Sequence, residues 1–205
     1  MLELIIDKKE NVKTIMLVEN GILLEKHEEH EKQRRLEGNI YLGKVQNVLS
    51  GMQSAFIDIG EEKNTLIKLK DVLPKVDEKN NKLNLEDKNI TEVLKSGQEI
   101  VVQIKKDGTL TKGAKVSTHI NLPGRFIALL PNSNFITVSQ KIENEQEKQR
   151  LVEIVKEILP QNTGAIIRTA AESKKQDEIK QDIEKLLGEW NKIQEKREKK
   201  NPPKL

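Results

Sequence analysis

Apolar residues in the first 24 positions alternate with polar ones or form short runs, which is the spacing of β-strands. Residues 1–6, 12–18 and 22–24 form three such segments, and Asn20-Gly21 has the composition of a hairpin turn. The pattern predicts an antiparallel strand meander within residues 1–37. Three short strands have too little surface to form a core alone, so this meander requires further sheet partners.

A second pattern of short strands begins at Gly38. The apolar segments are 39–48, 54–59, 64–69, 99–105 and 115–120, with a long polar insertion at 70–96. Five short strands with turn residues between them and one long loop fit a closed Greek-key barrel of the oligonucleotide/oligosaccharide-binding (OB) type. We therefore expect a five-stranded barrel domain over residues 38–120.

The pattern changes again at Pro123-Gly124. Strands are predicted at 125–130, 135–138 and 165–167, and an amphipathic helix at 145–159 ends at Pro160. A last helix is expected over 173–196, with Ser173 and Gln176 as its capping box. Residues 121–205 thus form a small α/β region with a C-terminal helix, and the fold class of the whole chain is α+β.

Charge and composition narrow the classes of protein only partly. The net charge of +3 arises from 36 basic and 33 acidic residues, a balance that permits nucleic-acid binding without proving it. The absence of cysteine excludes disulfides and thiolate metal sites. Because the sequence has no signal peptide and no apolar stretch of about 20 residues, we expect a cytoplasmic protein without a membrane span.

The segment "GAIIRTAAES" (164–173) carries the first candidate site. Arg168 and Thr169 follow a short apolar strand and precede a predicted helix, where a guanidinium, a hydroxyl and free backbone N–H groups can bind an anion. The alternative is that Arg168 pairs with a nearby acid and Thr169 caps the helix. The local sequence alone favours this alternative.

The predicted barrel carries the second candidate site. Phe56 lies in a barrel strand, and an aromatic ring beside lysines on such a face can stack bases while the lysines contact phosphates. The lysines expected near it are Lys44, Lys63, Lys105, Lys106 and Lys112. An equal alternative is that Phe56 belongs to the core. The segment 108–115 lacks the Gly-Lys-Ser/Thr ending of a phosphate-binding loop, which argues against nucleotide hydrolysis.

Several blocks together resemble one family. The segments "GNIYLGKVQNVLSGMQSAFIDIG" (38–60), "TKGAKVSTHINLPGRFIALLP" (111–131) and "GAIIRTA" (164–170) are similar, in order and spacing, to the N-terminal half of the ribonuclease E/G family. The resemblance implies that 1–37 begins a split RNase H-like domain, that 38–120 is an S-one-type OB domain, and that 121–205 is a 5′-sensor region. The missing sheet partners of the meander would then come from later in the family's sequence.

The resemblance also implies roles for individual residues. Arg168 and Thr169 would bind the 5′-monophosphate of RNA, with the backbone of Gly124 close to that terminus. Lys141 stands where the family often has an arginine, and Ala128 replaces a larger aliphatic residue near the terminal nucleotide. In the barrel the implied contacts of single-stranded RNA are Phe56, Lys112, Lys44 and Lys106, with Leu66 where a second aromatic residue is common.

The implied function is the RNA-binding and 5′-monophosphate-sensing portion of a single-strand-specific endoribonuclease of RNA processing and decay. The family's Mg²⁺-binding aspartates match no position of this chain, so we expect no catalytic residue, metal ligand or cofactor here and no nuclease activity from it alone. A homo-oligomer remains open for the full-length enzyme. The alternatives are a non-catalytic RNA-binding regulator and a translation-associated OB-fold protein, and 205 residues could be a fragment or the natural length.

Overall fold

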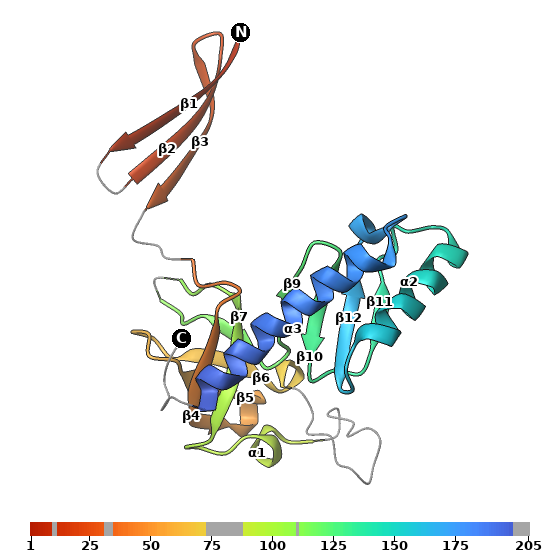
Figure 1. Ribbon diagram of the computed structural model, residues 1–205. Helices are drawn as coiled ribbons and strands as arrows, with labels where there is room; N and C mark the ends of the chain where they lie inside the picture. The colour runs from red at the N-terminus through yellow and green to blue at the C-terminus, as the bar shows by residue number, and fades with distance from the viewer. Residues whose placement is uncertain (10–11, 31–34, 73–87, 110, 199–205) are drawn as a thin grey trace. The chain divides into compact units, whose positions relative to one another are not determined.

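The computed structural model describes residues 1–9, 12–30, 35–72, 88–109 and 111–198 (Figure 1). The chain divides into two compact units, Met1–Leu36 and Glu37–Leu205. Each unit has its own sheet structure, so the two are described in turn.

The first unit is the three-stranded antiparallel sheet expected from the sequence. Its strands are β1 (Leu2–Lys9), β2 (Val12–Glu19) and β3 (Ile22–His30), with β2 in the centre (Figure 1). Asn20 and Gly21 connect β2 to β3 with φ angles of 51° and 81°, as a tight hairpin turn requires. Large apolar side chains stay exposed on this sheet: Leu2, Leu4, Ile5, Ile6, Ile22, Leu23 and Leu24.

The second unit begins with a closed five-stranded barrel, which confirms the OB-type prediction. The strands are β4 (Ile40–Leu49), β5 (Ser54–Asp58), β6 (Thr65–Lys68), β7 (Glu99–Lys106) and β8 (Lys115–Ser117), closed in the order β4-β5-β6-β8-β7. Adjacent strands are antiparallel except β6 and β8, which are parallel. The barrel interior is filled by alternate side chains of the strands, including Val45, Ala55, Ile57, Ile67, Val102, Ile104 and Val116.

In the part of the chain that the structure describes, three short helical segments flank the barrel strands. They are η1 (Ser50–Met52), η2 (Leu69–Asp71) and α1 (Ile90–Val93). Helix α1 falls in the segment expected to be a polar loop, and a capping box formed by Asn89 and Glu92 starts it. The burial of Ile90 and Leu94 explains why this one turn is helical, because both side chains join the core.

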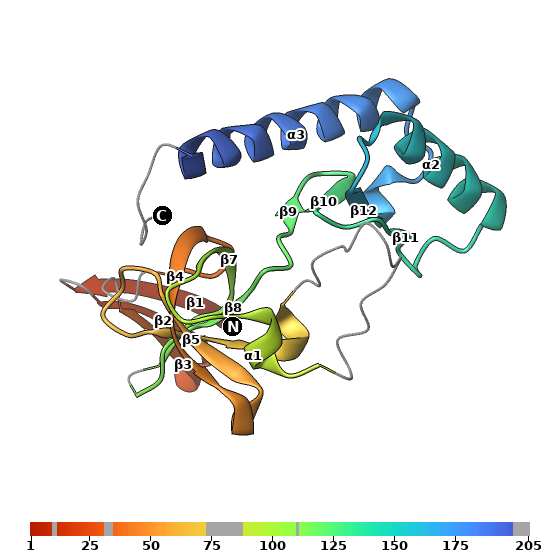
Figure 2. The same ribbon diagram turned by 90° about the horizontal axis from the view of Figure 1, so that it is seen from below.

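The C-terminal part of the second unit is a four-stranded sheet with two helices. The strands β9 (Leu122–Pro123), β10 (Ile127–Pro131), β11 (Ile136–Val138) and β12 (Thr163–Ile167) are ordered β11-β12-β10-β9. Helices α2 (Glu145–Ile158) and α3 (Gln176–Glu198) contact each other and the sheet (Figure 2). One core contains Ile127, Leu129, Ala165 and Ile167 of the sheet, Leu151, Ile154 and Val155 of α2, and Ile179, Ile183 and Leu186 of α3.

The side chain of Gln103 connects the barrel to this region. It is 8% exposed, and its amide donates to the carbonyl oxygens of Gly38 and Asn121 while its oxygen accepts from the N–H of Asn121. Ile40 and Val101 of the barrel also pack against the core of the C-terminal sheet. These contacts explain why the barrel and the C-terminal sheet form one unit.

The predicted capping box of the last helix is wrong. Helix α3 begins at Gln176, and Ser173 adopts a left-handed backbone conformation with φ of 59°. The helical signature at 173–175 is overridden because the N–H of Ser173 is bound by a side chain of another helix, Glu147 of α2. Among the described residues, no helix has the length and apolarity that crossing a membrane requires.

Candidate functional site

Arg168 directly follows β12, at the end of the C-terminal sheet. Its backbone N–H donates to Phe126, which continues the pairing of β10 with β12, and its backbone is extended. The guanidinium Nη1 donates to the carbonyl oxygen of Gly124 over 2.7 Å. Within the described part of the chain, this guanidinium has no carboxylate partner, so the side chain is anchored through one nitrogen and is otherwise exposed.

Gly124 lies in a tight turn between β9 and β10. Its N–H donates to the carbonyl of Ile127 over 2.8 Å. A methyl group at position 124 would lie 2.6 Å from Oδ2 of Asp182 and 2.8 Å from both the Ile127 oxygen and Cδ1 of Leu186. A side chain has no room there, which gives a packing reason for glycine beside Arg168.

Asp182 of α3 holds this turn in place. Its carboxylate accepts hydrogen bonds from three successive backbone N–H groups, those of Arg125 (3.1 Å), Phe126 (2.7 Å) and Ile127 (3.2 Å). Hydrogen bonds to an ionised acceptor are stronger than neutral ones, so Asp182 fixes the carbonyl that Arg168 contacts. Sequence analysis did not indicate Asp182, which looks like one more acid on a charged helix.

Thr169 begins a short 3-10 turn, η4 (Thr169–Ala171), rather than capping α3. Its side chain is exposed and makes no hydrogen bond to any residue that the structure describes. Ala171 is completely buried at the end of the turn and anchors it to the core. The Thr169 side chain is therefore exposed at the residue that follows Arg168.

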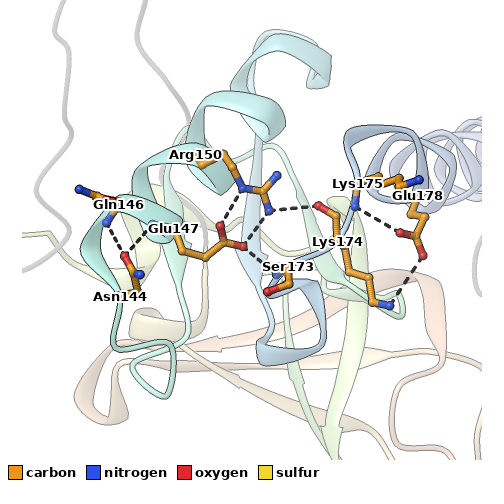
Figure 3. A network of polar contacts seen from close by, with 8 residues as sticks. All are labelled: Asn144, Gln146, Glu147, Arg150, Ser173, Lys174, Lys175 and Glu178. Atoms are coloured by element: carbon orange, nitrogen blue, oxygen red, sulfur yellow. Dashed lines mark hydrogen bonds and ion pairs between the residues drawn. The ribbon is translucent and has the colours of Figure 1, made fainter.

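An ion pair within α2, between Glu147 and Arg150, is hydrogen-bonded to the chain just after η4 (Figure 3). Arg150 donates to Glu147 through both Nε and Nη2 at 2.7 Å, and Nη2 also donates to the Lys174 carbonyl at 3.0 Å. Glu147 accepts from the Ser173 N–H at 2.8 Å. The hydrogen bond from Arg150 lowers the pKa of Glu147 to about 2, which keeps this carboxylate ionised at neutral pH.

Two further cations lie beside the same turns. The Arg125 guanidinium lies 5.1 Å from the centroid of the Phe126 ring, and the Lys174 ammonium lies 6.0 Å from it. Phe126 is 5% exposed, and both cations lie over its ring in cation–π geometry. Three basic residues, Arg125, Arg168 and Lys174, thus surround one short stretch of chain.

Ala128 and Lys141 take different positions. Ala128 is buried in β10, opposite Ile166, on the sheet face that also carries Arg168 two residues further along. Lys141 is exposed just beyond β11, which is parallel to β12, so it lies at the same end of the sheet as Arg168. The structure thus brings Gly124 and Arg168 into contact and places Ala128 and Lys141 around them without direct bonds.

On the barrel, Phe56 points outward rather than into the core. It is half-buried, whereas its neighbours Ala55 and Ile57 on β5 are fully buried inside. Phe56 lies opposite Leu66 on β6, and Leu66 lies opposite Lys115 on β8. The next partner of Lys115 is Lys106 on β7. We call Phe56, Leu66, Lys115 and Lys106 the cross-strand row.

Lys44 and Lys112 are arranged differently from this row. Lys44 is exposed on β4, between Asp58 of β5 and Glu99 of β7 in the strand register, so acids flank its charge on both sides. Lys112 is exposed in the turn before β8, where its N–H donates to the Thr109 hydroxyl. Among the described residues, no group of three or more His, Asp or Glu side chains converges to hold a metal ion.

Comparison of the sequence with known proteins finds relatives in one family. Residues 121–205 match the model of the ribonuclease E/G family. Ribonuclease G of Haemophilus influenzae is 40% identical over 199 residues, which is 96% of this chain and 40% of that protein. Ribonuclease E of Nostoc is 37% identical over 169 residues, 82% of this chain and 24% of its own length. A solution structure of GSP13 from Bacillus subtilis is 22% identical, with a TM-score of 0.32 over 42% of this chain and 56% of that one.

Proposed function

The chain belongs to the ribonuclease E/G family, and from this premise we propose that it binds single-stranded RNA and recognises a 5′-monophosphate end. The observation that carries the proposal is the pairing of Arg168 with the Gly124 carbonyl at an exposed turn held by Asp182. An arginine anchored through one nitrogen keeps its other N–H donors for an anion.

The proposed pocket binds the terminal phosphate from one side of the sheet end. Arg168 donates charge-assisted hydrogen bonds, Thr169 donates from its hydroxyl, and Lys141 adds a positive charge. Lys141 is a compact ammonium on a flexible stem, so it contributes charge without the two-pronged geometry of an arginine. Ala128, a small residue on the same sheet face, leaves the terminal nucleotide with less apolar contact than a larger side chain would give.

This pocket discriminates among RNA 5′ ends. A 5′-hydroxyl leaves the charged donors without an acceptor, and a hydrogen bond to a charged group contributes about 1.5–3 kcal/mol. A triphosphate adds charge and bulk beyond the anion that the donors match. Monophosphate-terminated RNA is therefore the preferred ligand.

The barrel provides the second contact. A base stacks on the exposed face of Phe56, which contributes about 1–3 kcal/mol, while Lys106 and Lys112 approach the phosphates. Leu66 gives apolar contact without a π-face, so we expect one strong stacking position rather than two. Lys44 contributes least because Asp58 and Glu99 flank it.

The activity of the whole protein is a proposal of its own. The chain spans 40% of the length of the Haemophilus relative. We propose that single-strand-specific cleavage in RNA processing and decay belongs to the larger family protein, with this chain selecting the RNA. Among the described residues no group of three or more His, Asp or Glu side chains converges, and we assign no hydrolytic step to them.

A binding assay tests the proposal with three short single-stranded RNAs that differ only at the 5′ end: monophosphate, triphosphate or hydroxyl. We expect the monophosphate to bind best, and Arg168→Ala to weaken it about 10- to 100-fold, the loss of one or two charged hydrogen bonds. Arg197→Ala, which removes an exposed guanidinium at the end of α3, is the matched control.

Equal affinity of the wild type for the three RNAs would remove the sensor role. RNA binding without end preference would then favour a regulator or a translation-associated OB-fold protein.

A further inference from the structure

We propose that Lys106 and Lys115 act together as a phosphate-binding pair that extends the RNA path across the barrel from Phe56. The proposal deepens the RNA-binding function proposed above and rests on it. Sequence analysis did not indicate Lys115, because β6, β7 and β8 come together only in the closed barrel.

The strand register makes the four side chains of the cross-strand row neighbours. Phe56 pairs with Leu66, Leu66 with Lys115, and Lys115 with Lys106. Neighbouring strands lie about 4.8 Å apart, so the row extends about 14 Å across the sheet. The cross-strand row therefore has the aromatic ring of Phe56 at one end and the ammonium groups of Lys115 and Lys106 at the other.

All four side chains lie on the outer face of the barrel. On β8, Val116 is buried next to the exposed Lys115. On β7, Ile104 is buried and Lys106, two residues further on, is exposed because the register shifts between them. Thr65 and Ile67 flank Leu66 and are likewise buried inside. A single-stranded RNA that follows the outer surface of the barrel can therefore contact all four side chains of the cross-strand row.

Lys106 and its neighbour Lys105 differ in whether an acidic side chain neutralises their charge. Lys105 forms an ion pair with Asp71 at 2.7 Å. Lys106 and Lys115 have no acidic partner within 4.0 Å among the described residues, and they lie directly opposite each other. Like charges directly opposite on a sheet are destabilising, so this pair costs stability unless an anion lies between its members.

The register irregularity beside the pair has a structural consequence. The pairing of β7 with β8 shifts between Ile104 and Lys106. A bulge of this kind changes the direction of a side chain locally. It lets Lys105 pair with Asp71 while Lys106 stays opposite Lys115.

These observations fit the chemistry of single-stranded nucleic acid. A base lies against Phe56 and Leu66, and a phosphate further along the strand accepts hydrogen bonds from both ammonium groups. A phosphate between the two lysines removes their mutual repulsion, so binding relieves a cost already present in the free protein.

The test measures binding of a 5′-hydroxyl oligouridylate of about 10 nucleotides, within the usual site size of one OB fold, by the full 205-residue chain. The hydroxyl end removes the contribution of a terminal phosphate. The variants are Lys106→Gln, Lys115→Gln and the double variant. Lys105→Gln is the matched control, because it removes the adjacent, ion-paired lysine.

Each single substitution of the pair should weaken binding about three- to tenfold and lower the slope of log affinity against log salt by about 0.7. The double variant should lose about 1.4 from the slope. The midpoint of thermal unfolding should stay the same or rise, because the opposed charges are gone. Lys105→Gln should leave the salt slope unchanged.

A wild-type salt slope in the Lys115→Gln and Lys106→Gln variants would overturn the proposal, as would a fall in their unfolding midpoints that accounts for the loss of affinity. Phe56→Ala separates this failure from failure of the underlying function. If Phe56→Ala weakens binding and the lysine variants do not, the barrel binds RNA without this pair. If the wild type does not bind the RNA at all, both proposals fail.

Discussion

The carboxylate of Asp182 is the hydrogen-bond acceptor for the backbone turn at Gly124. This carboxylate accepts hydrogen bonds from three successive N–H groups, so these groups are unavailable to a ligand. The carbonyl of Gly124 then faces Arg168 in a fixed position. The proposed anion site therefore uses exposed side chains as donors, with Asp182 holding the backbone turn that Arg168 contacts.

The Asp182→Ala variant tests this role. The lost acceptor leaves the N–H groups of Phe126 and Ile127 partly buried without a partner, which costs about 1–3 kcal/mol. For a chain of this size, each kcal/mol lowers the unfolding midpoint by about 2–4 °C. Asp182→Asn should lose less, because its amide oxygen still accepts, and Glu189→Ala on the exposed side of α3 is the control. A midpoint unchanged in Asp182→Ala would show that the turn holds without this carboxylate.

Some residues of the candidate sites could be predicted from the sequence, and others could not. Arg168, Gly124 and Phe56 stand in recognisable blocks, and the structure places the first two in contact and the third on the outer barrel face. Asp182 and Lys115 could not be found in this way. One is an acid among many on a charged helix, and the other gains its neighbours only from strand register.

At the scale of elements, the Glu147–Arg150 ion pair of α2 is hydrogen-bonded to a segment outside that helix. It joins the first turns of α2 to the backbone at Ser173 and Lys174, immediately after η4 (Figure 3). Because Asn144 caps α2 through its own side chain, the position of Glu147 is fixed from two directions. The turn that presents Thr169 is thereby attached to a helix distant in sequence.

Glu147→Gln should destabilise the protein by about 1 kcal/mol at pH 7, the upper range for an exposed pair. The pKa of Glu147 falls from 4.5 to about 2 on folding, so the ionised pair stabilises the fold above pH 4.5. That advantage over the variant should disappear as the pH falls from 4.5 to 2. Unfolding midpoints across this range measure it, with Glu153→Gln on the exposed face of α2 as the control. A difference that stays constant down to pH 2 would contradict the assigned cause.

Strands and helices long enough to show a repeating pattern of apolar residues could be predicted from the sequence, whereas very short ones could not. The barrel strands and helix α2 follow from spacing, and α2 ends at Ile158, one residue before the expected end. Strand β9 has two residues and α1 four, too few to show a period. The start of α3 was misplaced because Glu147, a tertiary partner, captures the Ser173 N–H.

At the scale of the molecule, the buried core lies entirely in the second unit. Every buried hydrophobic residue falls between Tyr41 and Leu186 in the described part of the chain, and none lies in Met1–Leu36. The first sheet instead exposes its apolar side chains, with Leu2 62%, Leu4 65% and Ile22 67% exposed. We therefore expect the barrel and its attached sheet to fold without the first unit.

A chain that begins at Glu37 should therefore keep the unfolding midpoint of the 205-residue protein within about 2 °C, less than the loss of 1 kcal/mol would cause. Its affinity for the monophosphorylated RNA should also be unchanged, because Phe56, Lys115 and Arg168 all belong to the second unit. Residues 1–36 alone should not fold, since three exposed strands lack a core. Thermal unfolding and RNA titration of the shortened chain measure both quantities. A large fall in its midpoint would mean that the first sheet stabilises the barrel through contacts that form in solution.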